Sequence, residues 1–75
     1  MYRVGEVVRT AQGLAVVRSP DAEHAEIGTE VLDDELTDVG RVVDVFGPVE
    51  QPYLAVTPEA DVHLPGLVGR VLYAR

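Results

Sequence analysis

The side chains that could do chemistry in this chain are two histidines and a set of carboxylates, and their spacing is poor for catalysis. His24 and His63 stand 39 residues apart, and neither has a cysteine or a second histidine beside it. A zinc site needs several ligands close together, so the remaining ligands beside these histidines would have to be carboxylates from scattered positions in the sequence. We interpret both as loop residues and expect no metal and no cofactor.

The carboxylates at residues 33–35 and at Asp44 are also candidates for metal binding or catalysis. The run Asp33-Asp34-Glu35 could hold a hard cation, but it lacks the alternating ligands and the turn glycine of a calcium loop, so we interpret it as a solvated turn. Asp44 could act as an acid or base if it were buried, yet no histidine, serine or second acid is adjacent in sequence. We expect it to accept backbone N–H groups and to fix the following loop. The chain is therefore predicted not to be an enzyme.

The elements that position these residues are predicted to be strands. Seventy-five residues allow one domain, residues 1–75, and fifteen of them are valine, which suits a pleated strand. Short strands are expected over residues 4–8, 13–18, 29–32, 39–43, 53–57 and 68–72. The first, fourth and sixth share a glycine at their second position, and a glycine inside a strand is typical of a bulge or sharp bend.

Six short strands in one domain favour an all-β fold, a small closed or nearly closed six-stranded barrel, because closure removes exposed edges. No helix is expected over residues 22–36, where unpaired acids and Gly28 oppose it. The predicted core consists of one valine from most strands, with two from the first: Val4, Val8, Val16, Val31, Val43, Val56 and Val71.

The charge is strongly negative and unevenly distributed. The net charge is −7, lysine is absent, and residues 21–38 hold eight acids without a base. We favour a solvated surface of a salt-adapted host over an acidic binding tail. Without lysine or an arginine cluster in sequence, binding to nucleic acid by this domain alone is disfavoured. The longest apolar runs have four residues, so no membrane association is expected, and we predict a cytoplasmic protein, monomeric when free.

The most informative segment runs from Gly40 to Tyr53. It contains two prolines four residues apart, Pro48 and Pro52, which stiffen a loop flanked by Phe46 and Tyr53. Aromatic side chains on a stiff loop are typical anchors of a protein interface. The alternative is a rigid connector whose aromatic rings fill the end of the barrel. The candidate partner-binding residues are Phe46, Gly47, Pro48, Val49, Pro52 and Tyr53.

This segment resembles the Gar-type core proteins of H/ACA guide-RNA ribonucleoproteins, in the Gar/Naf family. The matching residues, in the order and spacing of that family, are Gly40, Val42, Asp44, Phe46, Gly47, Pro48, Val49, Pro52 and Tyr53. The likeness extends to Gly5, to Gly13-Leu14 and to the closing residues 68–73. The resemblance also implies a six-stranded barrel.

By this resemblance the chain would bind the dyskerin-type pseudouridine synthase at its catalytic domain. It would assist substrate loading and product release in rRNA modification, and would meet guide RNA only indirectly, through the complex. The arginine-glycine tails of eukaryotic members are not present in this sequence, and its acidity is unusual for the family, which together suggest an archaeal, halophilic version. Two alternatives stay open: the related H/ACA assembly factor, and a PRC-like barrel of ribosome-maturation type, in which the Phe-Gly-Pro-Val and Pro-Tyr elements are not expected.

Overall fold

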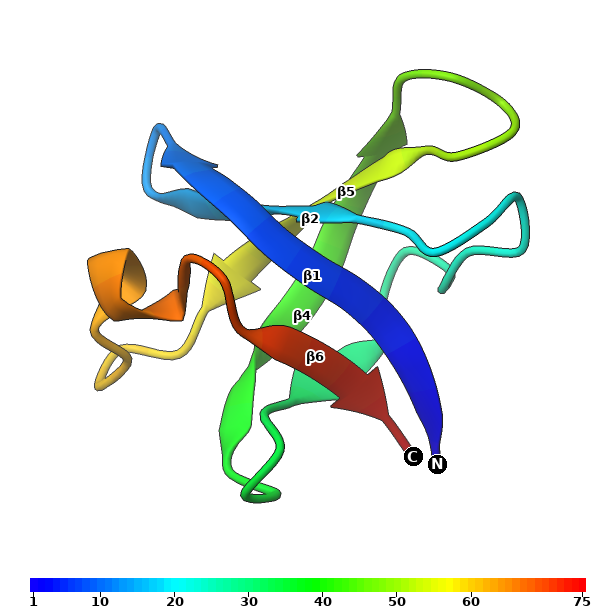
Figure 1. Cartoon of the computed structure of the whole chain (residues 1–75). Helices are drawn as coiled ribbons and strands as arrows, with labels where there is room; N and C mark the ends of the chain where they lie inside the picture. Colours follow the sequence, from blue (N-terminus) through cyan, green and yellow to red (C-terminus); the bar gives the residue numbers. More distant parts are fainter.

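The protein is an all-β, closed six-stranded antiparallel barrel, as predicted. The computed structural model describes all residues 1–75. The elements are β1 (Tyr2–Ala11), β2 (Leu14–Arg18), β3 (Glu30–Leu32), β4 (Asp38–Phe46), β5 (Tyr53–Pro58), the 3-10 helix η1 (Leu64–Leu67) and β6 (Val71–Ala74). Around the barrel the strands follow the order β1-β2-β5-β4-β3-β6, so that the two termini lie side by side (Figure 1).

The sixth strand differs most from its prediction. Residues 68–70 form a turn, and the strand begins only at Val71. In this turn Gly69 N–H donates to the Val7 carbonyl and Arg70 N–H donates to the Leu67 carbonyl. Val7 belongs to β1, so the turn is bonded to that strand. Gly69, however, has a φ of 90°, and the Arg70 N–H turns back to Leu67, which explains why a valine-glycine pattern typical of a strand does not form one here. The segment expected to lack a helix, residues 22–36, has none, whereas the short helix η1 was not predicted.

Beta-bulges make the barrel core differ from the simple alternation of a flat strand. Between β1 and β2, Val7 pairs with Val17 and Arg9 with Val16, so Val8 is an extra residue. Val43 is the extra residue of β4 against β5 in the same way. A bulge shifts which side chains face inward.

The predicted core is therefore partly wrong. Val4, Val16, Val31 and Val56 are buried as expected. At the two bulges, however, Val7 and Val42 take the inward positions, while Val8 is half-buried and Val43 is 42% exposed. Val71 is also half-buried, because Leu72 and Ala74 are the residues of β6 that face the core. The main cluster consists of Val4, Val7, Ala15, Val17, Ala25, Val31, Val39, Val42, Leu54, Val56, Leu67, Leu72 and Ala74.

Two strand glycines permit the close backbone approaches that bend and close the sheet. A Cβ atom on Gly40 would overlap the carbonyl oxygen of Thr57 on β5, and one on Gly5 would overlap that of Arg18 on β2. The bending lets β4 pair with β3 over residues 38–41 and with β5 over residues 40–46. Glycine at these positions is thus required by space, in agreement with the bend expected from the sequence.

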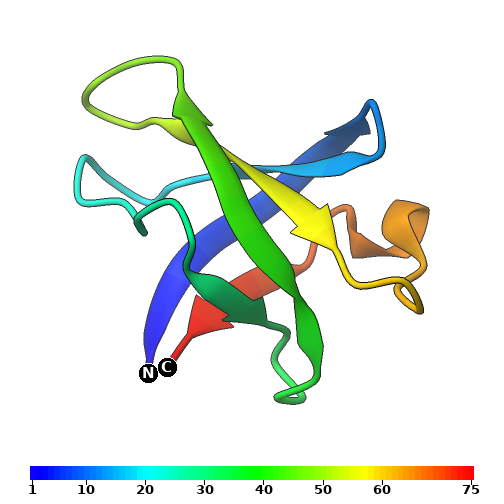
Figure 2. The ribbon, with the colours of Figure 1, turned by 180° about the vertical axis from the view of Figure 1, so that it is seen from behind.

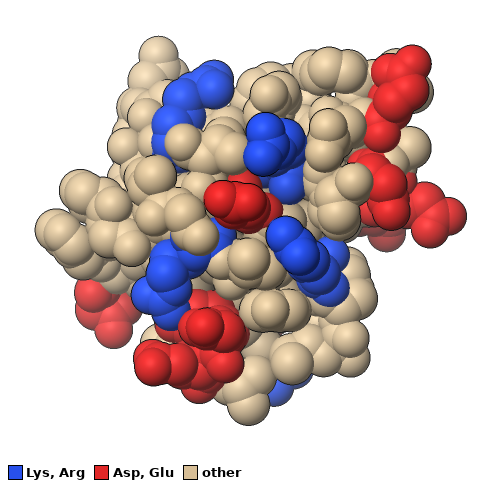
Figure 3. Space-filling model, in the orientation of Figure 1, with Lys and Arg blue, Asp and Glu red and all other residues tan.

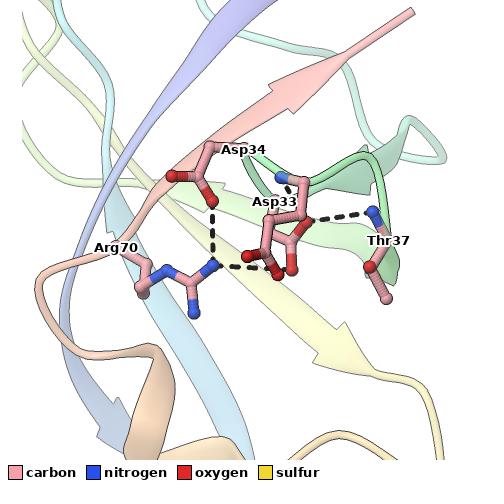
Figure 4. Close-up of polar contacts among 5 residues, drawn as sticks. Asp33, Asp34, Thr37 and Arg70 are labelled. Atoms are coloured by element: carbon pink, nitrogen blue, oxygen red, sulfur yellow. Dashed lines mark hydrogen bonds and ion pairs between the residues drawn. The ribbon is translucent and has the colours of Figure 1, made fainter.

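The acidic turn after β3 is more ordered than a solvated turn, which corrects the sequence interpretation of Asp33. This side chain is buried, and its Oδ1 accepts hydrogen bonds from the backbone N–H groups of Glu35 and Thr37, both at 2.9 Å (Figure 4). Arg70 Nη2 lies 2.9 Å from Asp34 Oδ1 and 3.5 Å from Asp33 Oδ2. The hydrogen bond with Asp34 raises the pKa of the Arg70 guanidinium above its usual value. A base that is remote in sequence therefore compensates part of the acidic segment.

No helix of the protein is both long and apolar enough to cross a membrane.

Gly40→Ala tests the close approach of β4 and β5. The added methyl group would force the two backbones apart, and we expect a loss of about 1–3 kcal/mol in the free energy of unfolding, measured with urea. Gly66→Ala is the matched control, because its Cβ would meet only the exposed side chain of His63, at 3.0 Å. Equal losses in the two variants would contradict a steric requirement at Gly40.

Asp33→Ala tests the hydrogen-bonded turn. It leaves two backbone N–H groups without their acceptor, so we expect a loss of about 1–3 kcal/mol in unfolding free energy. Asp33→Asn keeps a side-chain oxygen as acceptor and should recover most of the loss. Asp34→Ala, which removes only an exposed ion pair, should cost less than Asp33→Ala. If Asp34→Ala proved the more damaging, the Arg70 pair would be the main stabilising interaction of this turn.

Candidate protein interface

The connection between β4 and β5 is held in one shape by its backbone. Gly47 begins it with a φ of 90°, a conformation that favours glycine. Gln51 N–H then donates to the Pro48 carbonyl at 3.3 Å, and the Pro52 carbonyl accepts from Ser19 N–H at 2.9 Å. Pro52 is buried, and Ser19 is fully buried. The loop is therefore tied to the end of β2 at its base while its tip projects from the barrel (Figure 1).

The two aromatic residues of this segment stack on each other outside the barrel. Phe46 and Tyr53 are the last register pair of β4 and β5, and their ring centroids lie 5.7 Å apart with an interplanar angle of 26°. Neither ring belongs to the core cluster, and Phe46 is 39% exposed. The rings thus form an external surface and do not fill the barrel end, which was the alternative left open by the sequence.

Gly47 is required by the position of the Tyr53 ring as well as by its own conformation. A Cβ atom on Gly47 would lie 2.8 Å from Cδ2 of Tyr53. The ring can rest against the loop backbone only because that atom is absent. Gly47, Phe46 and Tyr53 are accordingly one packed unit.

A second segment, residues 19–29, lies beside this loop in both ribbon views (Figures 1 and 2). Ala25 anchors it in the core, and Gly28 N–H donates to the Val42 carbonyl on β4. Between the two segments is a shallow hollow of about 280 Å³, lined by Ala22, His24, Val45, Phe46, Gly47, Pro48, Val49 and Pro52. Ile27 and Val45 border an adjoining, more open hollow with His24 and Glu26.

The six residues predicted for partner binding fall into two groups. Phe46, Pro48 and Val49 are exposed, Val49 by 83%, while Tyr53 is half-buried and Pro52 is buried at the loop base. Gly47 is exposed and shapes the turn. The structure adds Ile27, 63% exposed, which the sequence analysis missed because it treated that segment only as acidic. The one feature of the sequence that could have indicated Ile27 is that it is a large aliphatic residue in a segment rich in acids.

The charges beside the loop and beside residues 19–29 are mostly negative, and Arg18, the register neighbour of Tyr53, is the exception. Glu26 lines the open hollow, and the exposed acids Asp44 and Glu50 adjoin Val45 and Val49 in sequence. Asp44 Oδ1 accepts the Val45 N–H at 2.8 Å, which confirms that it is a backbone acceptor, and its exposure excludes the buried acid considered from the sequence. Apolar anchors within an acidic rim can bury area against a partner whose rim is basic.

The two histidines lie at separate places. His24 Nδ1 is 2.9 Å from the Ala25 carbonyl oxygen beside the hollow. His63 is exposed and directly precedes η1.

Comparison with known proteins finds no family model that matches the chain and no curated protein that matches it.

Phe46→Ala tests whether the aromatic stack is surface or core. Because the ring is partly exposed and contacts mainly one other ring, we expect a loss of about 1 kcal/mol or less in the free energy of unfolding. Leu54→Ala, one residue beyond Tyr53 and fully buried, should cost about 2–5 kcal/mol. A loss for Phe46→Ala as large as that for Leu54→Ala would place the ring among the structural residues.

Proposed function

We propose that the chain is a non-catalytic subunit that docks, through the Phe46–Tyr53 stack and its loop, onto the dyskerin-type pseudouridine synthase of an H/ACA ribonucleoprotein. The observation that carries the proposal is the exposed aromatic stack on a stiffened loop, outside a closed barrel whose core is complete without it. Such a surface can bury area with little further ordering.

The loop is pre-organised for binding. Its base is tied by Pro52 to Ser19, and its aromatic rings are already stacked. Little conformational entropy remains to be lost when a partner covers it. Phe46, Val49 and Ile27 would supply the apolar anchors, and the acids beside them would favour a basic rim on the partner.

The choice of partner depends on the resemblance described above, and the roles of the matching residues support it. Gly40 permits the approach of β4 to β5, Gly47 makes room for Tyr53, and Phe46 stacks on Tyr53. Among the matching residues, Phe46, Gly47 and Tyr53 together shape one surface, and Gly40 permits the pairing of the two strands that carry it. The pairing of Phe46 with Tyr53 brings the two ends of the loop together.

In this function the chain takes no part in bond making. It would bind the catalytic domain of the synthase as a monomer in the cytoplasm, favour substrate loading and product release, and meet guide RNA only through the complex. A role of this kind alters turnover without altering the chemical step, which gives it a kinetic signature.

Binding and turnover measurements test the proposal. The chain should bind the synthase, and Phe46→Ala or Val49→Asp should weaken the affinity about tenfold, the effect of removing a single anchor. Addition of the chain should raise multiple-turnover pseudouridylation of a guided RNA while leaving the single-turnover rate nearly unchanged.

Val68→Asp is the matched control, since Val68 is 50% exposed next to η1 and remote from the loop in the fold. It should bind the synthase like the parent chain. If the parent chain does not bind the synthase, the synthase is rejected as the partner. If Val68→Asp weakens binding as much as Val49→Asp, the proposed surface is rejected.

A further inference from the structure

The exterior of β1 and β2 carries three of the six arginines of this acidic protein. Arg3 and Arg9 on β1 and Arg18 at the end of β2 are all exposed. Between Ser19 and Val68 the sequence holds twelve of the thirteen acids and a single arginine. Because β1 pairs with β2, the arginines of these two strands come together, and Figure 3 shows basic side chains gathered over this face. We call Arg3, Arg9 and Arg18 the arginine face.

These arginines have no partner within the chain. All ion pairs of the protein are made by Arg70, with Asp33 and Asp34. The one acid of β1, Glu6, lies directly across from Arg18 in the sheet but forms no ion pair with it. Three guanidinium groups around one carboxylate are thus left to interact with something outside the molecule.

The arginine face is continuous with the aromatic surface. Register pairs link Glu6 to Arg18, Arg18 to Tyr53, and Tyr53 to Phe46, across β1, β2, β5 and β4. Directly paired residues point to the same side of a sheet, and none of these four is buried. With strands spaced about 4.8 Å apart, the row spans roughly 14 Å, well within one protein interface.

We propose that the arginine face binds a protein surface on which carboxylates surround a single basic side chain. Arginine forms two parallel hydrogen bonds with a carboxylate, and three such groups at fixed positions select a pattern of acids. Glu6 selects the basic group at the centre. This proposal goes beyond the docking loop and does not rest on the synthase being the partner.

A nucleic acid fits the same face less well. A phosphate backbone would bring only negative charge to Glu6, and the net charge of −7 opposes its approach. Three arginines would also neutralise only a few phosphates, which leaves binding weak and strongly dependent on salt.

Nuclear magnetic resonance titration with synthetic probes tests the proposal. The probe is a flexible peptide with glutamates on both sides of one lysine, used at low salt against the isotope-labelled protein. We expect saturable shifts at Arg3, Glu6, Arg9 and Arg18. Exchange of the three arginines for glutamine should weaken binding about tenfold, since each exposed charge pair contributes modestly. Arg18→Gln alone should weaken peptide binding by a smaller factor. This single variant keeps the test valid if the triple variant is less stable.

Two controls separate this proposal from its competitors. Arg41→Gln removes an exposed arginine of β4, outside the arginine face, and should change the affinity less than twofold. Glu6→Gln should weaken binding of the peptide but not of a variant peptide with glutamine in place of lysine.

The proposal is overturned if no saturable shift appears at the arginine face, or if Arg41→Gln weakens binding as much as the triple variant. It is overturned in favour of nucleic acid if a single-stranded oligouridylate binds more tightly than the peptide and Glu6→Gln strengthens that binding. Phe46→Ala should leave peptide binding unchanged. Failure of the synthase experiments therefore has no bearing on this result.

Discussion

Closure of the barrel depends on how closely β4 approaches β5 and β1 approaches β2. At Gly40 and Gly5 the backbone of one strand lies where the Cβ of any other residue would overlap a carbonyl oxygen of the next. These approaches let each of the two strands bend between its two neighbours. β1 pairs with β6 over residues 2–6 and with β2 over residues 6–11, and β4 pairs with β3 over residues 38–41 and with β5 over residues 40–46. Short strands can then form a closed sheet in which every strand has two neighbours, and no edge remains open for aggregation.

The bend of β4 also accounts for the candidate interface. The bulge at Val43 turns the final residues of the strand so that Val42 is buried while Val45 borders the surface hollow and Phe46 stacks on Tyr53. The strand therefore contributes to the core at its centre and to the candidate interface at its end. A rigid core element that continues directly into the binding loop is a means of holding anchors in place without a larger domain.

The charges show a similar dependence on topology. Acids dominate the middle of the chain and arginines its two ends, and the pairing of β1 with β2 gathers Arg3, Arg9 and Arg18 on one face. Arg70 alone crosses to the acidic segment, where it meets the turn ordered by Asp33. An interior that consists almost wholly of aliphatic side chains contributes little specificity for partners, so discrimination must come from this uneven exterior.

The sequence by itself was sufficient for the all-β class, the six-stranded barrel and the position of the connection between Phe46 and Tyr53. Valines, isolated glycines and prolines favour particular backbone conformations, and these preferences depend only on residues that are near in sequence. The sequence did not predict which side chains face the inside of the barrel. The bulges at Val8 and Val43 reverse the inward and outward alternation of side chains along the strand, and a bulge exists only in relation to the register with a second strand. The burial of Asp33, the contribution of Ile27 to the interface and the gathering of the arginines were likewise decided only by the tertiary structure. Each of them depends on how separate segments pack: Arg70 meets Asp33 and Asp34, Ile27 lies beside Val45, and β1 pairs with β2.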